Sequence, residues 1–246
     1  SRSPTITTEK PDGSVIGNGQ TGTHRPGMDL TFSAPKSLSM LAYVGGDTRL
    51  LDANMAAVKA TLAWAEKNLA EARTGAGGAN VVKTGNLLVA LFQHDTSRNL
   101  DPQAHVHAVI ANATQTADGK WHALHNDKLW SNNTLLGSIY HAYLREGVTK
   151  LGYAIGSVGK HGSFEIAGVD RNAVEAFSTR RAEILATAAE KLDNPENVSP
   201  QTLRQIALRT RAPKQDIANR GELQQSWRDR AAANGIDLSP VVEAAR

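Results

Sequence analysis

Three histidines lie close together in one stretch of the chain, Phe92-Gln-His-Asp-Thr-Ser-Arg-Asn-Leu-Asp-Pro-Gln-Ala-His-Val-His-Ala-Val-Ile110. His105 and His107 are separated by a single residue within an apolar run, and His94 precedes them across a polar segment. In a β-strand, residues i and i+2 share a face and lie roughly 7 Å apart. Two imidazoles at that spacing can converge on one metal ion, with a third supplied by a neighbouring strand.

The surrounding residues predict a hairpin that brings the third histidine to the other two. Residues 87–93 and residues 105–114 form two apolar runs, and the segment between them has the Asp, Ser, Arg, Asn and Pro of a loop. Antiparallel pairing places His94, at the end of the first strand, opposite the start of the second. The alternative is that these histidines are ordinary polar residues of the strands. That interpretation suits a single histidine better than three histidines at the open end of one hairpin. The sequence therefore predicts a three-histidine metal site at the rim of a sheet.

The composition limits the classes of protein to which the chain can belong. It has 246 residues, of which 40% are hydrophobic and 21% are charged, so a sizeable core is expected. There is no cysteine, which excludes disulfides, thiolate catalysis and sulfur-ligated zinc and favours a reducing compartment. The formal net charge of +3 is compatible with a nucleic-acid partner without requiring one. No apolar stretch approaches the roughly 20 residues of a membrane span, so we expect no membrane insertion.

The hydrophobic periodicity predicts an α+β fold, with a central antiparallel sheet flanked by helices. Strands are expected at residues 28–32, 87–93, 105–114, 120–124 and 164–166. Helices are expected at residues 35–43, 47–73, 131–151, 170–177, 179–192, 200–211 and 221–234. The expected N-caps are Ser131, Asp170, Ser178 and Ser199, and Gly152 is expected to stop a helix. No strand pattern follows residue 168, so residues 1–168 are expected to form one unit and residues 169–246 an all-helical one.

Three segments together resemble the relaxase domain of MobF-type conjugative relaxases, the TraI- and TrwC-like enzymes that start plasmid transfer. They are His24-Arg-Pro-Gly-Met-Asp-Leu-Thr-Phe-Ser-Ala-Pro-Lys-Ser37, Thr84-Gly-Asn-Leu-Leu-Val89 and His94-Asp-Thr-Ser-Arg-Asn-Leu-Asp-Pro-Gln-Ala-His-Val-His107. Shorter matches follow at Asn112-Ala-Thr-Gln115, Leu151-Gly-Tyr153 and Gly159-Lys-His-Gly162. The resemblance covers nearly the whole chain. A bare His-x-His pair is weak, whereas the full string with its Asp-Pro-Gln spacing is highly specific.

The resemblance implies a site-specific endonuclease and strand transferase that nicks one strand of a plasmid transfer origin. In such enzymes a tyrosine hydroxyl attacks the scissile phosphate, forms a phosphotyrosine link to the 5′ end and releases the 3′ hydroxyl. The metal ligands map to His94, His105 and His107, and the implied cofactor is a divalent ion, magnesium or manganese, with zinc as a further candidate. Asp29 maps to the active-site acid, which accepts a hydrogen bond from a ligand imidazole or takes the tyrosine proton. Asp95 either plays the same part or caps the loop.

The resemblance also implies the surroundings of the site. The partners are single-stranded transfer-origin DNA, accessory relaxosome proteins and a coupling protein in the bacterial cytoplasm. Residues 1–168 correspond to a catalytic palm, and residues 169–246 to helical fingers that close over the DNA. We expect DNA contacts from Arg25, Lys36, Arg98, Trp121, Lys160, Arg211 and Lys214. Of the other tryptophans that are candidates for base stacking, Trp130 is favoured, Trp227 is open, and Trp64 falls on a helix stripe.

The basic tail has a second interpretation. Its arginines and lysines can equally form a solvated helix face, because Asp216 and Glu222 are interspersed among them.

The chain departs from the family pattern at the nucleophile. Family members carry their nucleophilic tyrosines close to the N-terminus, whereas the 23 residues before His24 contain no tyrosine. Tyr43 and Tyr153 do not match the family position, and Tyr140 and Tyr143 fall on a helix face expected to be core. We therefore expect the chain to lack the segment that carries the nucleophile, and to bind metal and DNA without cleaving.

Three other functions are weighed against the relaxase. A rolling-circle replication initiator would use the same His-x-His sheet, with Tyr140 or Tyr143 as the nucleophile. A three-histidine zinc hydrolase of small substrates would bind zinc tightly, keep an open water position and have no affinity for DNA. A non-catalytic DNA-binding module would describe a chain without its tyrosine. The motifs that flank the histidines favour the relaxase.

Overall fold

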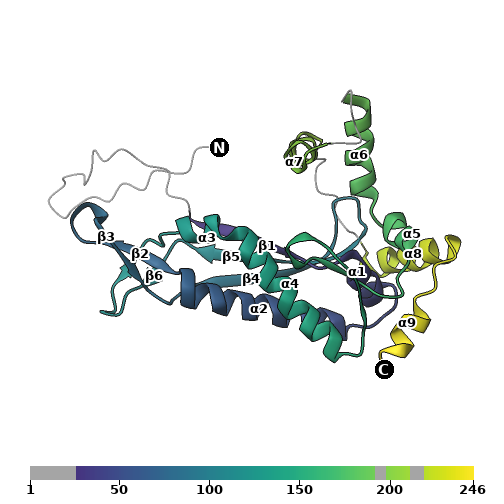
Figure 1. The fold of residues 1–246 in the computed structure, drawn as a ribbon, viewed down its shortest axis with the longest axis horizontal. Helices are drawn as coiled ribbons and strands as arrows, with labels where there is room; N and C mark the ends of the chain where they lie inside the picture. Colours follow the sequence, from purple (N-terminus) through teal and green to yellow (C-terminus); the bar gives the residue numbers. More distant parts are fainter. Residues whose placement is uncertain (1–25, 192–197, 211–218) are drawn as a thin grey trace.

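The structure, a computed structural model, describes residues 26–191, 198–210 and 219–246. The strands with helices α2 and α4 form an elongated body, and the helices that follow β9 gather at one end of it (Figure 1). The described strands are β1 (Gly27–Ser33), β2 (Glu71–Thr74), β3 (Asn80–Lys83), β4 (Val89–Thr96), β5 (Pro102–Ala111), β6 (Thr114–Gln115), β7 (Trp121–His122), β8 (Ile155–Val158) and β9 (Phe164–Ile166). The described helices are α1 (Lys36–Tyr43), α2 (Arg49–Leu69), α3 (Asp127–Ser131), α4 (Asn133–Lys150), α5 (Arg171–Ala176), α6 (Thr179–Lys191), α7 (Pro200–Arg209), α8 (Arg220–Ala233) and α9 (Ser239–Ala244), with 3-10 turns at Ala76–Gly78 and Lys160–Gly162.

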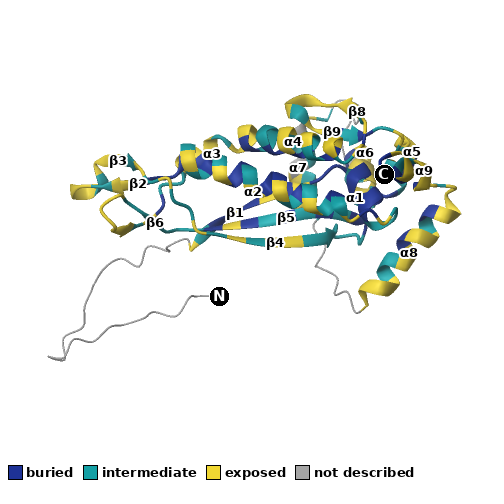
Figure 2. Ribbon diagram, turned by 90° about the horizontal axis from the view of Figure 1, so that it is seen from below, coloured by how far each residue is buried: buried dark blue, intermediate teal, exposed yellow. Residues whose placement is uncertain are grey.

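The central sheet is antiparallel and has three strands in the order β1-β5-β4. Side chains alternate across it, so that every second residue of β1 and β5 is buried. Helices α2 and α4 cover the buried face, as Figure 2 shows. The core residues that β1 and β5 contribute to this face are Met28, Leu30, Phe32, Val106, Ala108 and Ile110. The expected α+β fold with a central antiparallel sheet is confirmed.

Helix α2 covers the sheet because its apolar residues recur every three or four positions. Its buried apolar residues are Leu50, Ala57, Val58, Leu62, Ala65 and Leu69. The Tyr140 hydroxyl of α4 donates to the Asn54 side chain of α2 at 2.6 Å, and the Tyr140 ring lies 5.3 Å from the ring of Phe32. Both helices and β1 therefore meet at one point in the core. Neither α2 nor any other described helix is long and apolar enough to cross a membrane.

Two helix boundaries differ from those expected. The helix expected over residues 47–73 ends at Leu69, because the next residues form β2, which pairs with β3. The Glu71 carbonyl at the start of β2 also accepts a hydrogen bond from the His125 amide. The helix expected over residues 131–151 is divided into α3 and α4, so that Asn132, not Ser131, precedes its long part. Gly152 follows α4 with a φ of +95°, a value that favours glycine and agrees with the expected stop.

The boundaries of three strands also differ from those expected. The two histidine strands are β4, which extends to Thr96, and β5, which begins at Pro102 and ends at Ala111. The strand expected over residues 120–124 is reduced to Trp121–His122. The loop between β4 and β5 is therefore shorter than the sequence suggested.

Beyond β9, every described element is a helix, as expected. The Asp170 side chain accepts from the Asn172 amide at the start of α5, and Ser199 accepts from the Thr202 amide at the start of α7, so both expected caps are confirmed. Ser178 instead donates its hydroxyl to the Val174 carbonyl at 2.6 Å. Helix α9 was not expected, because six residues are too few to show a helical period. The functional division at residue 168 remains a prediction.

A buried carboxylate joins the start of α2 to the segment after α4. Asp47, whose side chain is 4% exposed, accepts from Arg49 Nε at 2.8 Å and Nη2 at 2.6 Å, and from the Tyr153 hydroxyl at 2.7 Å. The hydrogen bond from the Arg49 guanidinium is the main reason why the pKa of Asp47 falls to about 2. The ionised form of Asp47 therefore stabilises this corner of the fold.

We expect Asp47→Asn to lower the free energy of unfolding at neutral pH by roughly 1–2 kcal/mol, since one pKa unit corresponds to about 1.4 kcal/mol and water screens the partly exposed Arg49. Because the pKa is lowered in the folded state, this stabilisation is complete above the unfolded-state value of about 4 and is lost as the pH falls through the folded-state value. Urea unfolding of wild type and variant at neutral pH and at about pH 2.5 measures both effects.

Glu146→Gln is the control, because it removes only an exposed ion pair with Lys150. It should change stability less than Asp47→Asn at neutral pH. A stability loss in Asp47→Asn that stays the same at both pH values would contradict the assignment.

Candidate metal and nucleic-acid site

The register of the central sheet brings the three histidines onto its uncovered face. His94 of β4 pairs directly with His105 of β5, and His107 lies between Thr31 of β1 and Phe92 of β4. The ring centres are 5.2 Å apart for His94 and His105, 5.1 Å for His94 and His107, and 5.2 Å for His105 and His107. His94 was expected at the end of the first strand, facing the start of the second. It does face His105, and because β4 continues to Thr96, it lies inside its strand.

The Nδ1 atoms of two of these imidazoles bind protein oxygens. His107 Nδ1 lies 2.7 Å from Asp29 Oδ2 and 3.2 Å from Thr31 Oγ1, and His105 Nδ1 lies 2.9 Å from the Gln103 carbonyl oxygen. A carboxylate or carbonyl oxygen only accepts, so Nδ1 of each ring carries a proton, and in the neutral form of the ring Nε2 has the free lone pair. A histidine that binds a metal through one nitrogen usually donates from the other in this way. Asp29, on the neighbouring strand, is placed to orient His107.

The distances between the three rings suit the binding of one shared metal ion, whereas the orientations of the rings do not. Around an ion bound at about 2.0–2.1 Å, ring centres at tetrahedral angles lie roughly 5.2 Å apart, close to the distances observed here. However, His94 stacks on His105 at 22°, and a nitrogen lone pair points along its ring plane. Within the described ranges, no group of three or more histidine or acidic side chains is arranged to hold a metal as it stands. The rings would therefore have to turn about their side-chain torsions, while the backbone register stays as it is.

The protonation state of the cluster also matters for metal binding. Burial lowers the pKa of His105, and the neighbouring His107 and His94 lower it further. A lowered pKa keeps the imidazole neutral near pH 7, and only the neutral ring can donate a lone pair to a metal ion. The donor set is thus chemically fit for a divalent cation.

Apolar side chains border the histidines on the same face, and sequence reasoning missed them. Phe92 is 53% exposed although it lies in the most apolar run of the chain, and Leu88 and Val109 are exposed as well. An open groove of about 570 Å³ runs beside them, lined by Asp29, Leu88 and Val109 among others. The period of two offered a signal, because Val109 follows His107 by two positions and Phe92 precedes His94 by two.

The residues expected to contact DNA differ in how far their side chains are exposed. Lys160 is exposed, Arg98 is half-buried, and Trp121 is 55% exposed. Lys36 is not displayed on the surface: its Nζ donates to the Pro102 carbonyl at 2.9 Å, and burial lowers its pKa to about 8. The three expected contacts that lie outside the described residues are Arg25, Arg211 and Lys214.

The tryptophans differ in their availability for stacking. Trp130 is 49% exposed and, like Trp121, is a suitable candidate for stacking on a base. Trp64 is half-buried and packs against the core, as expected. Trp227 is buried and donates its indole N–H to the Leu100 carbonyl, so it is not available to a base.

Three of the four tyrosines are in environments that do not favour attack on phosphorus. The hydroxyls of Tyr140 and Tyr153 donate to Asn54 and Asp47 in the core, and burial raises the pKa of both. Burial also raises the pKa of Tyr43 to about 12. Tyr143 is exposed on α4 and is not a core residue, contrary to the expectation from its helix face.

Comparison with known proteins identifies the family. The model of the TrwC relaxase family matches residues 4–234. The multifunctional conjugation protein TraI of Escherichia coli strain K12 is 40% identical over 247 residues, which cover 96% of this chain and 13% of the relative. The chain thus spans about an eighth of the length of that relative.

Solved structures of TrwC are similar throughout. A metal-bound structure of conjugative relaxase TrwC in complex with oriT DNA superposes with a TM-score of 0.80 at 40% identity, covering 94% of this chain and 78% of that one. TrwC complexed with a 27-mer DNA comprising the recognition hairpin and the cleavage site gives a TM-score of 0.79 at 39% identity, covering 91% and 82%. On the combined weight of the family model, the sequence identity and the shared fold, this chain belongs to the TrwC relaxase family.

Proposed function

We propose that this chain is a relaxase domain that binds one strand of a plasmid transfer origin and takes part in nicking it by metal-assisted tyrosine transesterification. The observation that carries the proposal is the histidine cluster on the uncovered face of the sheet, with Asp29 bound to His107 at 2.7 Å. The relatives support it, since TraI is described as a conjugation protein and the TrwC structures contain oriT DNA.

In this proposal His94, His105 and His107 hold a divalent cation through nitrogen. When bound, the cation neutralises charge on a non-bridging oxygen of the scissile phosphate and so lowers the barrier to attack by an anionic oxygen. Asp29 holds the Nδ1–H of His107, which fixes the ring and makes Nε2 more basic. Magnesium, manganese and zinc are the candidate ions. Three nitrogen donors favour zinc over manganese by intrinsic affinity, so the ion used in the cell depends on availability as well.

The bond changes balance without an external energy source. A tyrosine hydroxyl gives up its proton and its oxygen forms a bond to phosphorus, while the bond from phosphorus to the 3′ oxygen breaks and that oxygen takes up a proton. One phosphodiester replaces another, so the strand can be rejoined without ATP. We propose that none of the four tyrosines of this chain is the attacking group, because three have raised pKa values and the chain shows no tyrosine at the family position.

The exposed aromatic and basic residues would then serve the DNA. Trp121 and Trp130 offer faces on which bases can stack, and Lys160 and Arg98 would neutralise phosphates. Lys36, expected to do the same, is engaged by the Pro102 carbonyl instead. We further propose that residues 169–246 act as fingers over the strand. Accessory relaxosome proteins and a coupling protein in the bacterial cytoplasm are proposed partners on the family relationship alone.

The alternatives are less well supported. A rolling-circle initiator needs Tyr140 or Tyr143 as its nucleophile. Tyr140 is buried and bonded to Asn54, so this alternative depends on the exposed Tyr143 alone. A zinc hydrolase of small substrates would share the histidines but would not account for relatives whose structures contain oriT DNA.

The metal site is tested by isothermal titration of the chain with Mn²⁺ and Zn²⁺. We expect His107→Ala to abolish measurable binding, because it removes a ligand. Asp29→Asn should weaken binding by roughly tenfold, since loss of a partner that orients a ligand typically costs 10–100-fold. His122→Ala, in strand β7, is the matched control and should bind like the wild type. Equal affinities in wild type and His107→Ala would refute the site.

The DNA site is tested by binding of the 27-mer that carries the TrwC recognition hairpin and cleavage site, with a dT 27-mer as the non-specific reference. We expect Trp121→Ala to weaken binding by about tenfold or more, because stacking on an aromatic ring contributes roughly 1–3 kcal/mol per base. Val81→Ala, which truncates an exposed apolar side chain outside the proposed fingers, should have no such effect.

The salt dependence of the same binding provides a separate readout. Log affinity should fall linearly with log salt concentration, because bound cations are released from each neutralised phosphate. Absence of any binding to either oligonucleotide would overturn the DNA function and favour the small-substrate hydrolase.

A further inference from the structure

Helix α8 contacts the histidine hairpin at three points. Arg220, Trp227 and Arg230 lie seven and three positions apart, which places them within about a quarter turn of one another on the helix. Arg220 forms an ion pair with Asp95 on β4, and Trp227 and Arg230 reach the far end of the hairpin loop. One side of a single helix thus contacts the hairpin near both ends of its loop.

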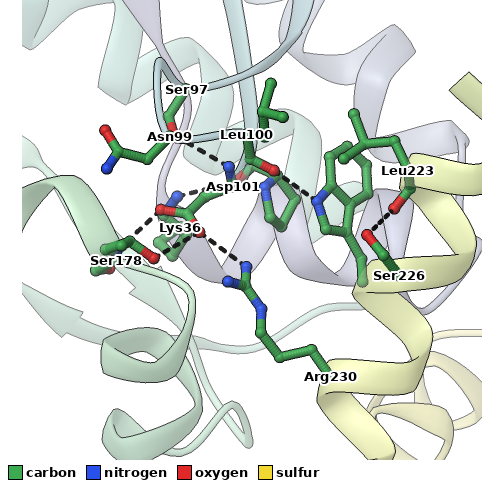
Figure 3. A network of polar contacts seen from close by, with 12 residues as sticks. Lys36, Ser97, Asn99, Leu100, Asp101, Ser178, Leu223, Ser226 and Arg230 are labelled. Carbon is green, nitrogen blue, oxygen red and sulfur yellow. Dashed lines mark hydrogen bonds and ion pairs between the residues drawn. The ribbon is translucent and has the colours of Figure 1, made fainter. Parts of the chain in front are cut away.

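The contacts at the loop are short and buried (Figure 3). Trp227 Nε1 donates to the Leu100 carbonyl at 2.7 Å, and Arg230 Nη2 donates to Asp101 Oδ1 at 2.8 Å. The side chain of Asp101 is 1% exposed. It also accepts from the amide and the hydroxyl of Thr179, both at 2.9 Å. Helices α6 and α8 therefore both donate hydrogen bonds to this carboxylate.

The two α8 side chains are themselves held in place. Trp227 is buried, and its ring centre lies 5.8 Å from that of Tyr43 on α1. The Arg230 guanidinium lies over the ring of Phe177 at 4.2 Å. A planar cation fixed on an aromatic face loses less freedom when it binds a carboxylate than a mobile one does.

The loop adopts a conformation that requires such support. Leu100 has a φ of +58°, which is uncommon for a residue other than glycine and costs free energy. Its carbonyl is the acceptor for Trp227. The hydrogen bond from the indole therefore stabilises a residue whose backbone conformation is unfavourable.

The loop adjoins the point where His94 pairs with His105. Asp95 adjoins His94, and the register between β4 and β5 is irregular between His94 and Thr96, close to the loop. A slip of one residue at that point would turn His94 to the opposite face of the sheet. Contacts that fix the loop therefore fix which side chain of β4 stands opposite His105.

We propose that α8 positions the histidine cluster, with Trp227 and Arg230 as positioning residues of the metal site. This inference rests on the proposed metal function and adds to it that the helical region controls the spacing of the ligands. Metal affinity should then respond to substitutions on α8 that touch no histidine.

The test is titration with Co²⁺ alone, followed by its visible absorption, which depends on the geometry of the ligands. The variants are Trp227→Phe, which keeps the ring and removes the donor, and Arg230→Gln, which leaves Asp101 its bonds from Thr179. Arg230→Lys keeps the positive charge. Arg228→Gln is the matched control, because Arg228 lies on the same helix and donates to Gln225 within it. Circular dichroism establishes that each variant is folded at the temperature of the titration.

We expect the Kd for Co²⁺ to rise by about tenfold in Trp227→Phe and Arg230→Gln, the lower end of the effect of losing an outer contact of a metal site, with a changed absorption spectrum. Arg230→Lys should recover part of the loss, and Arg228→Gln should match the wild type. Wild-type affinity and spectrum in both Trp227→Phe and Arg230→Gln would overturn the inference while leaving the metal site intact. If the wild type itself binds no Co²⁺, the proposed metal function fails, and the inference fails with it. Should Arg230→Gln prove unfolded, Trp227→Phe and Arg230→Lys decide the question.

Discussion

The pairing of β4 with β5, in the register that sets His94 opposite His105, is the constraint on which the rest of the site depends. Direct cross-strand neighbours lie close enough to interact, and period-two alternation brings His107 to the same face. Strand β1 completes the arrangement from the other side, because its register places Asp29 and Thr31 near His107. Residues from three strands thus meet through backbone hydrogen bonds.

One face of this sheet packs in the core, and the other face carries the polar residues of the site. Its covered face is apolar and packs under α2 and α4, whereas its uncovered face carries the histidines, Asp29 and the exposed Phe92 (Figure 2). Ligands that stand on strands held by a packed core keep their spacing better than ligands on loops. The rings need only turn about their own torsions to share an ion, since the backbone already sets their separation.

The helices after β9 do more than close one end of the molecule. Asp101, at the foot of β5, receives hydrogen bonds from α6 and α8, and α8 also pairs with Asp95 beside His94. Helix α8, which follows His107 by more than a hundred residues, therefore directly contacts the hairpin that carries the histidines. In our proposal, this contact links the helical region to the metal site.

The sequence by itself determined the α+β class, the two histidine strands and the histidine triplet, because apolar runs and the spacing of two are local patterns. Only the tertiary structure decided that Glu71–Thr74 is a strand, since its partner β3 supplies the hydrogen bonds. Packing likewise decided that Trp227 is buried and Tyr143 exposed. In the sequence, the loop that contains Leu100 and Asp101 looks like any polar turn. The residues that contact it, Trp227 and Arg230, lie far along the chain. The free energy of these contacts depends on distances that no local pattern encodes.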